Sequence, residues 1–213
     1  MRRIILLVGL AGLALAGCDL PVSVHPISDD KSSALDERLL GQWEFVVPAD
    51  AERDPKAAPP RWLIARAPGR ERTHEIAYLE LDGENQAQLR RFDLYCLSLG
   101  DRHFLSIPTD PTAPKEKRVY WLGVYEFVND DLVKFMVLNK DLVAPAIDRE
   151  ELAGSVVKAV PDPNASPAEQ VKPKYKSIKI TAEPAELRAW LAKQGPALGN
   201  PSATMSMRRI EVK

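Results

Sequence analysis

The feature that most constrains the fold is a succession of short segments rich in aromatic and β-branched residues, separated by tight-turn signals. Turn dipeptides such as Pro68-Gly69 and Gly100-Asp101 stand between these segments. Repeated short strands joined by tight turns favour an antiparallel sheet that closes into a barrel or packs on itself. We therefore predict strands at residues 40–47, 61–67, 73–81, 87–97, 102–107, 118–129, 131–138, 176–180 and 204–212.

Two segments carry a helical pattern instead. Residues 184–193 begin with Pro184, which suits a first helical turn. One face of this helix would be apolar, formed by Leu187, Trp190 and Leu191. Residues 142–152 form a second candidate, in which Pro145 must lie in the first turn or before it. We expect a mainly β, antiparallel, barrel-like domain with one or two covering helices.

The composition describes an ordinary globular chain with balanced charge. Of its 213 residues 45% are hydrophobic, and 29 Lys and Arg stand against 30 Asp and Glu. This length suits one domain, whereas a nucleic-acid-binding surface would need clustered basic residues, so we expect no nucleic-acid partner. We assign a single β-rich domain to residues 38–213, with a proline-rich surface excursion at about 154–174.

The N-terminus begins with Arg2 and Arg3, followed by an uninterrupted apolar run at residues 4–15. A helix over this run would rise about 18 Å, which is too short for the ~30 Å hydrocarbon core of a bilayer. A short positive head before such a run is typical of a cleaved signal peptide, which we assign to residues 1–17.

The sequence Leu15-Ala16-Gly17-Cys18 follows this run and resembles the lipobox of bacterial lipoproteins. The resemblance implies cleavage between Gly17 and Cys18 and attachment of a diacylglycerol to the Cys18 thiol. Two or three acyl chains would hold the protein stably on a membrane, which one chain does not. The alternative is a plain secretory signal or an uncleaved anchor in which Cys18 is incidental.

The residues after the lipobox suggest a location. Residues 18–37 carry prolines, serines and charges without periodicity, and they predict a flexible tether. Asp19 resembles the residue that retains lipoproteins in the inner membrane of enteric bacteria. The resemblance therefore implies a protein that is lipid-anchored to the bacterial cell membrane and faces the periplasm. Asp19 favours the inner membrane, and the outer membrane is the alternative.

Gly41-Gln42-Trp43 opens the first predicted strand and resembles the Gly-x-Trp signature of lipocalins and lipocalin-like proteins. Gly41 would allow a close backbone approach, and Trp43 would plug one end of a small barrel. In that family an Arg of the last strand commonly lies over the Trp, which implies this part for Arg208 or Arg209. The alternative is a buried Trp in an unrelated β domain.

Few residues form a catalytic or metal-binding pattern. The histidines His25, His74 and His103 are too far apart for a zinc motif, and we expect no metal and no cofactor. Cys96 and His103 could meet across a turn, which keeps a Cys/His-dependent hydrolase or transferase as a third hypothesis. The apolar surroundings of Cys96 favour a buried thiol, so we assign no catalytic residue. The barrel-closing disulfide of lipocalins cannot form once Cys18 is lipidated.

The segment from Tyr120 to Phe127 alternates large apolar residues on both faces of its predicted strand. Such a strand has either a ligand or a helix such as 184–193 against its second face. Our first hypothesis is a non-enzymatic binding module for a small apolar molecule or an envelope component, which needs an internal cavity of at least ~300 Å³. The second is an accessory lipoprotein that docks on a membrane-protein partner through an exposed apolar patch.

Overall fold

The computed structural model describes residues 20–47, 59–81, 87–159 and 175–211. The strands are β1 (Val22–Ser23), β2 (Gly41–Phe45), β3 (Arg61–Arg66), β4 (His74–Leu81), β5 (Ala87–Leu99), β6 (Arg102–Pro108), β7 (Tyr120–Asn129), β8 (Leu132–Leu138), β9 (Gly154–Lys158), β10 (Tyr175–Ile180) and β11 (Gly199–Arg209). The α-helices are α2 (Lys140–Asp148) and α4 (Pro184–Lys193), and the 3-10 helices are η1 (Glu37–Leu39), η2 (Lys115–Lys117) and η3 (Pro196–Leu198). The predicted signal peptide, Gly17, Cys18 and Asp19 lie outside the described residues.

Eight strands close into an antiparallel barrel. Their order is β6-β5-β4-β3-β2-β11-β8-β7, and β6 pairs again with β7 to complete the circle. In this second pairing Leu105 lies opposite Gly123, and the register continues to Pro108 opposite Tyr120. The mainly β, lipocalin-like barrel with covering helices that the strand pattern predicts is therefore confirmed.

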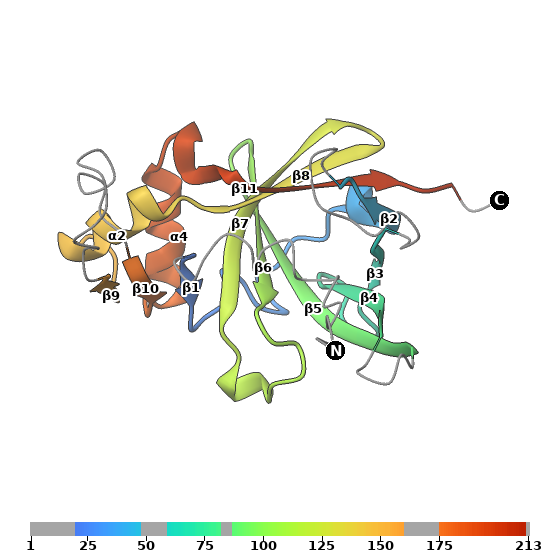
Figure 1. Cartoon of the computed structure of the whole chain (residues 1–213), viewed down its shortest axis with the longest axis horizontal. Coiled ribbons are helices and arrows are strands. Elements are labelled where there is room, and N and C mark those ends of the chain that lie inside the picture. The colour runs from blue at the N-terminus through green and yellow to red at the C-terminus, as the bar shows by residue number, and fades with distance from the viewer. Residues whose placement is uncertain (1–19, 48–58, 82–86, 160–174, 212–213) are drawn as a thin grey trace, which may run out of the picture.

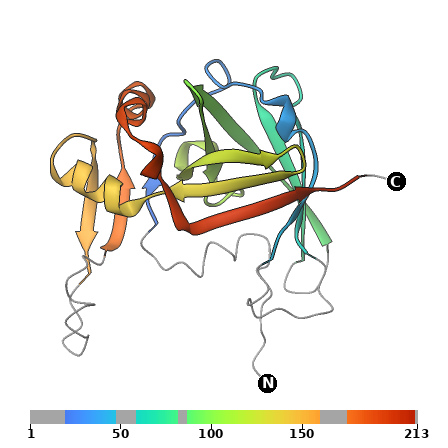
Figure 2. The ribbon, with the colours of Figure 1, turned by 90° about the horizontal axis from the view of Figure 1, so that it is seen from above.

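A second layer is attached to one side of the barrel (Figures 1 and 2). Where β8 leaves β7, the short strand β1 takes its place, and β10 and β9 extend the sheet away from the barrel. Helices α2 and α4 lie in this part of the molecule. Helix α4 has the bounds expected from its sequence, and it buries the predicted stripe of Leu187, Trp190 and Leu191.

Strands β5 to β7 form a wall shared by two cores. On the barrel side, Cys96 and Leu105 join the aromatic residues of the interior. On the other side, Phe104 and Leu122 belong to the cluster that contains Leu187 of α4. The sequence left two explanations for the large apolar residues on both faces of β7, a ligand or a covering helix. The second applies, because helical side chains cover the outer face.

The predicted tether at 18–37 differs from the structure over its described part. Leu20, Ile27 and Ser33 are buried, and Val22 and Ser23 pair with both β7 and β10. The serines and backbone amides of this segment find acceptors along strand edges, so a polar, aperiodic sequence still forms ordered structure. Residues 20–36 are therefore a strap along the domain rather than a flexible tether.

The strap binds to the part of β5 that lies beyond its pairing with β4. The pairing of β4 with β5 ends at His74 opposite Leu94, which leaves the next residues of β5 with a free edge. There the carbonyl oxygen of Cys96 accepts hydrogen bonds from Ser33 Oγ at 2.9 Å and from the Ala34 amide at 2.8 Å. The Ile27 amide donates to Ser106 Oγ at 2.8 Å. The strap thus completes the sheet that β4 leaves unfinished.

Two further expectations need correction. Pro145 lies in the second turn of α2, which begins earlier than predicted because Asn139 caps it by accepting from the Asp141 amide. Pro145 has no backbone N–H to donate within the helix, and the residues around it that pack into the core are Val143, Ala144, Ala146 and Ile147. The expected excursion at about 154–174 begins with an ordered strand, β9, which pairs with β10. Residues 160–174 lie outside the described part.

Candidate functional site

The end of the barrel next to η1 is closed by Trp43. Its ring is fully buried, and its Nε1–H donates to the carbonyl oxygen of Leu39 at 2.7 Å. The guanidinium of Arg209 lies over the ring, 4.4 Å from its centroid. Arg209 also donates from Nη1 to the Leu40 carbonyl at 2.7 Å and from Nη2 to the Arg38 carbonyl at 2.5 Å. This end of the barrel is a rigid plug rather than an entrance.

Gly41 makes room for that plug. Its φ of +131° is a conformation that residues with a side chain rarely adopt, and an added Cβ would lie 2.7 Å from Arg209 Nη1. Of the two arginines proposed from the sequence, Arg209 makes the contact with Trp43 and Arg208 is exposed. The site formed by Gly41, Trp43 and Arg209 is therefore architectural, because its polar groups are used within the chain.

A partly exposed polar cluster lies beside the plug. The Asp36 carboxylate accepts from Arg38 Nε at 2.9 Å and Nη2 at 2.7 Å, and from the Tyr125 hydroxyl at 3.1 Å. Burial opposes ionisation of Asp36, but the hydrogen bonds from Arg38 outweigh it, so the pKa of Asp36 is lowered. Burial raises the pKa of Tyr125, which keeps that hydroxyl protonated. The cluster stabilises a charged carboxylate and holds η1 against the barrel.

Cys96 and His103 do not form the nucleophile–base pair that catalysis would need. Cys96 is fully buried in the barrel, and burial raises the pKa of its thiol. The two ring nitrogens of His103 contact Ser98 Oγ at 3.0 Å and Arg38 Nη2 at 3.3 Å. A thiol that remains protonated in an apolar interior is a poor nucleophile.

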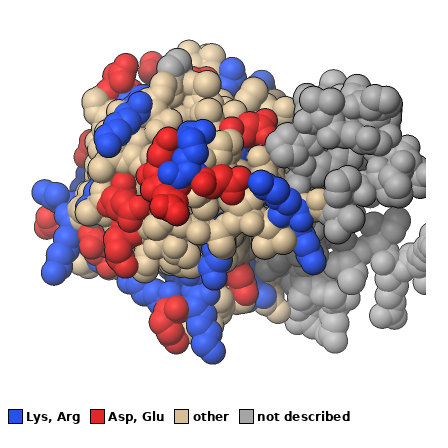
Figure 3. Space-filling model, turned by 90° about the vertical axis from the view of Figure 1, so that its left-hand side faces the viewer, with Lys and Arg blue, Asp and Glu red and all other residues tan. Residues whose placement is uncertain are grey.

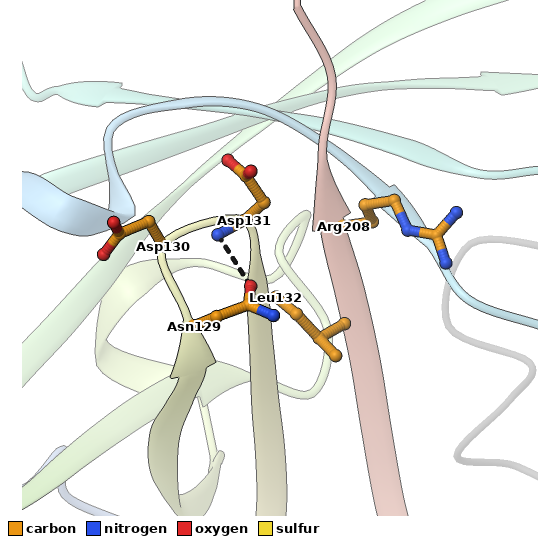
Figure 4. A pocket seen from close by; sticks show the side chains of 5 residues that line it. All are labelled: Asn129, Asp130, Asp131, Leu132 and Arg208. Carbon is orange, nitrogen blue, oxygen red and sulfur yellow. Dashed lines mark hydrogen bonds between the residues drawn. The ribbon is translucent and has the colours of Figure 1, made fainter.

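The surface hollow at the β7–β8 turn is wide and polar. It has a volume of about 480 Å³ and is lined by Asn129, Asp130, Asp131, Leu132 and Arg208. Figure 4 shows the two carboxylates and the guanidinium pointing in different directions, and the hydrogen bond drawn there runs from the Asp131 amide to Asn129 Oδ1 at 3.0 Å. Within the described ranges, no three His, Cys, Asp or Glu side chains come together as metal ligands. The hollow thus lacks convergent groups that would define a ligand.

The barrel interior is occupied by side chains. Large residues from several strands meet there, among them Trp43, Trp62, Tyr78, Phe92, Tyr125 and Phe135. An apolar hollow between β6, β7, β8 and β11 has a volume of about 20 Å³, which is room for about one water molecule. Ordinary small-molecule pockets have volumes of about 300–1,000 Å³. This hollow is therefore far smaller than the cavity that the first functional hypothesis requires.

The outer face of β3, β4 and β5 carries a stripe of exposed leucines. Leu63, Leu79 and Leu89 are 46%, 70% and 54% exposed. Leu79 lies directly opposite Leu89, and Leu63 lies opposite Ala77 on the next strand. We call these four residues the leucine stripe. Sequence reasoning missed it, although the apolar residues Ala77 and Leu79, which alternate with the buried Ile76 and Tyr78, are a signal for two apolar faces.

The face at the helical end has a different character. Figure 3 shows basic and acidic side chains interspersed over this side of the molecule. Several are paired, such as Arg149 with Glu151 at 2.7 Å and Lys158 with Asp148 at 3.2 Å. Such a mixed surface is typical of a face in contact with water. The leucine stripe is thus the more distinctive surface.

Comparisons with known proteins add no assignment. No family model, no curated protein and no solved structure matches the chain. None of the helices within the described ranges is both long enough and apolar enough to span a bilayer.

Proposed function

We propose that the protein is a lipid-anchored, periplasm-facing lipoprotein that acts without catalysis, as an accessory module docking on a membrane-protein partner through the leucine stripe. The observation that carries this proposal is the stripe itself, on the outer wall of a filled barrel. Exposed apolar groups that are neighbours across three strands mark an interaction surface more often than scattered ones do. A filled, plugged barrel is also a rigid support for such a surface.

The other two hypotheses have less support. A binding module for a small apolar molecule would have to enlarge a hollow of about 20 Å³ more than tenfold. A Cys/His-dependent enzyme would need an accessible thiolate, whereas Cys96 is buried among apolar side chains. Docking requires no rearrangement of the barrel, because Leu79 and Leu89 are already exposed.

The docking proposal is tested by placing a charge in the stripe. We expect Leu79→Asp, in the full chain expressed in its own envelope, to dissociate a detergent-solubilised complex and leave the lipoprotein at its own mass. The matched control is Val157→Asp on β9, because Val157 is also an exposed apolar residue of a strand, 48% exposed against 70% for Leu79, but lies outside the stripe. If both variants keep the complex, or both lose it, the stripe is not the docking surface.

The anchor is tested separately by mass spectrometry of the purified full-length protein. Lipidation predicts loss of residues 1–17 and a diacylglyceryl-modified Cys18, and Cys18→Ser should abolish both modification and membrane retention. For the sorting role of Asp19, Asp19→Ser should move the protein from the inner-membrane to the outer-membrane fraction. An unmodified Cys18 in a protein that stays on the membrane would contradict the lipobox assignment.

A further inference from the structure

The first described residue, Leu20, is packed into one end of the barrel. It forms a cluster with Val137 and Ala203, and Trp121 packs against this cluster. Val137, Ala203 and Trp121 also line the small hollow inside the barrel. Leu20 therefore covers the barrel opening that lies away from the Trp43 plug. We call this opening, with the residues around Leu20, the mouth.

The mouth and the plug lie at opposite ends of the barrel. Ala203 and Arg209 belong to the same strand, β11, and six residues of strand span about 20 Å. Arg209 contacts Trp43 of the plug and the carbonyl oxygen of Asp130, whereas Ala203 belongs to the cluster that contains Leu20. In Figure 1 the tip of the β7–β8 hairpin is at the upper right, and the start of β7, near the mouth, is at the bottom.

The chain between Leu20 and the proposed lipid is very short. One residue, Asp19, separates Cys18 from Leu20. A fully extended chain spans at most about 3.3–3.6 Å per residue, so the two steps from Cys18 to Leu20 span at most about 7 Å. The headgroup layer of a bilayer is itself about 5–8 Å thick on each side of the hydrocarbon core. A thioether-linked diacylglycerol must have its acyl chains in that core, so Leu20 cannot lie far outside the headgroup layer.

We propose that the mouth of the barrel is a membrane-contact surface, held against the lipid bilayer that carries the Cys18 anchor, with the plug pointing away from it. This inference rests on the proposed lipidation of Cys18 and goes beyond it, because a lipid on a flexible tether would leave the domain free to tumble. The strap removes that freedom, since the described chain is ordered and packed from Leu20 onward. The occupant of this surface is the phospholipid headgroup layer.

The test compares two fluorophore positions on the mature lipoprotein in phosphatidylcholine vesicles that contain a headgroup-nitroxide lipid. Ser202→Cys is exposed at the mouth and adjoins Ala203, whereas Asp130→Cys is exposed at the plug end. The buried Cys96 is not expected to label in the folded protein. We expect quenching at position 202 at least about twofold stronger than at position 130.

A linker variant supplies the matched control. About ten Gly and Ser residues inserted between Asp19 and Leu20 have a mean span of about 17 Å, so they should abolish the difference between the two positions while the protein stays on the vesicles. Equal quenching at both positions in the vesicle-bound native chain overturns the membrane-contact surface and leaves lipidation intact. An intact mass without diacylglycerol overturns lipidation, and the membrane-contact surface with it.

Discussion

The plug of the barrel leads to a sharp stability prediction for Arg209→Ala. Arg209 donates hydrogen bonds to the carbonyl oxygens of Leu40 and Arg38 and lies over the Trp43 ring. A hydrogen bond from a charged group contributes about 1.5–3 kcal/mol, and an exposed cation–π contact about 0.5–1 kcal/mol. Because the Arg209 side chain is 28% exposed, water can replace part of these contacts, so we take the low ends.

The low ends for the two hydrogen bonds and the cation–π contact sum to a loss of about 3.5 kcal/mol in the free energy of unfolding. With a urea dependence of about 2 kcal/mol per molar, the midpoint of unfolding should fall by about 1.7 M. The assay is equilibrium urea unfolding of the non-lipidated chain, followed by the fluorescence of its four tryptophans, among them Trp43. A shift in midpoint without a change in slope identifies a stability effect.

The adjacent Arg208 provides the control. Arg208 is exposed, and surface substitutions away from special features usually change stability by about 0.5 kcal/mol or less. Arg209→Lys should fall between the two alanine variants, because an ammonium keeps the charge but lacks the planar guanidinium fork. The reasoning is refuted if Arg209→Ala destabilises no more than Arg208→Ala.

Three further predictions concern buried groups. Burial lowers the pKa of His74 below its ordinary 6.5, so the folded state binds a proton at His74 less readily than the unfolded state does. The free energy of unfolding should therefore fall as the pH drops from about 6.5 toward the lowered pKa. In urea titrations His74→Gln should lose less of this free energy than the native chain does between about pH 7.5 and 5.5. Burial also raises the pKa of the Cys96 thiol, so a thiol reagent at neutral pH should modify native protein at a small fraction of the rate seen in denaturant, and equal rates would contradict a buried thiol. Ser33→Ala removes the hydroxyl that bridges the amide and carbonyl of Cys96 and should lower the free energy of unfolding by about 1–2 kcal/mol; an unchanged urea midpoint would show that the strap adds nothing there.

Alternation and periodicity were sufficient to predict the barrel and one helix. The eight barrel strands, β10 and α4 lie where local patterns predict them, because the spacing of apolar residues in each element indicates its buried face, whereas β1 and β9 were not predicted. The same alternation could also have identified Arg209, rather than Arg208, as the arginine that lies over Trp43. Met205 and Met207 alternate with polar residues in β11, and Met207 is fully buried, so Arg209 shares the inner face.

The strap and the filled interior could not be predicted in this way. The order of residues 20–36 depends on partners far along the chain, such as the carbonyl oxygen of Cys96 and the hydroxyl of Ser106. No local periodicity records such contacts. Whether a small barrel is hollow depends on how side chains such as Trp62, Phe92 and Phe135 interdigitate across it, and this is a property of volume and rotamers rather than of pattern.

The strap connects the two proposals. If Leu20 holds the mouth at the bilayer, the orientation of the leucine stripe is determined as well. Leu79 and Leu89 lie two residues from the ends of β4 and β5 that point toward the mouth, because β4 ends at Leu81 and β5 begins at Ala87. The exposed leucines would then stand close to the membrane surface. A partner that covers them must reach the same level above the bilayer, and an integral membrane protein satisfies this requirement without any movement of the barrel.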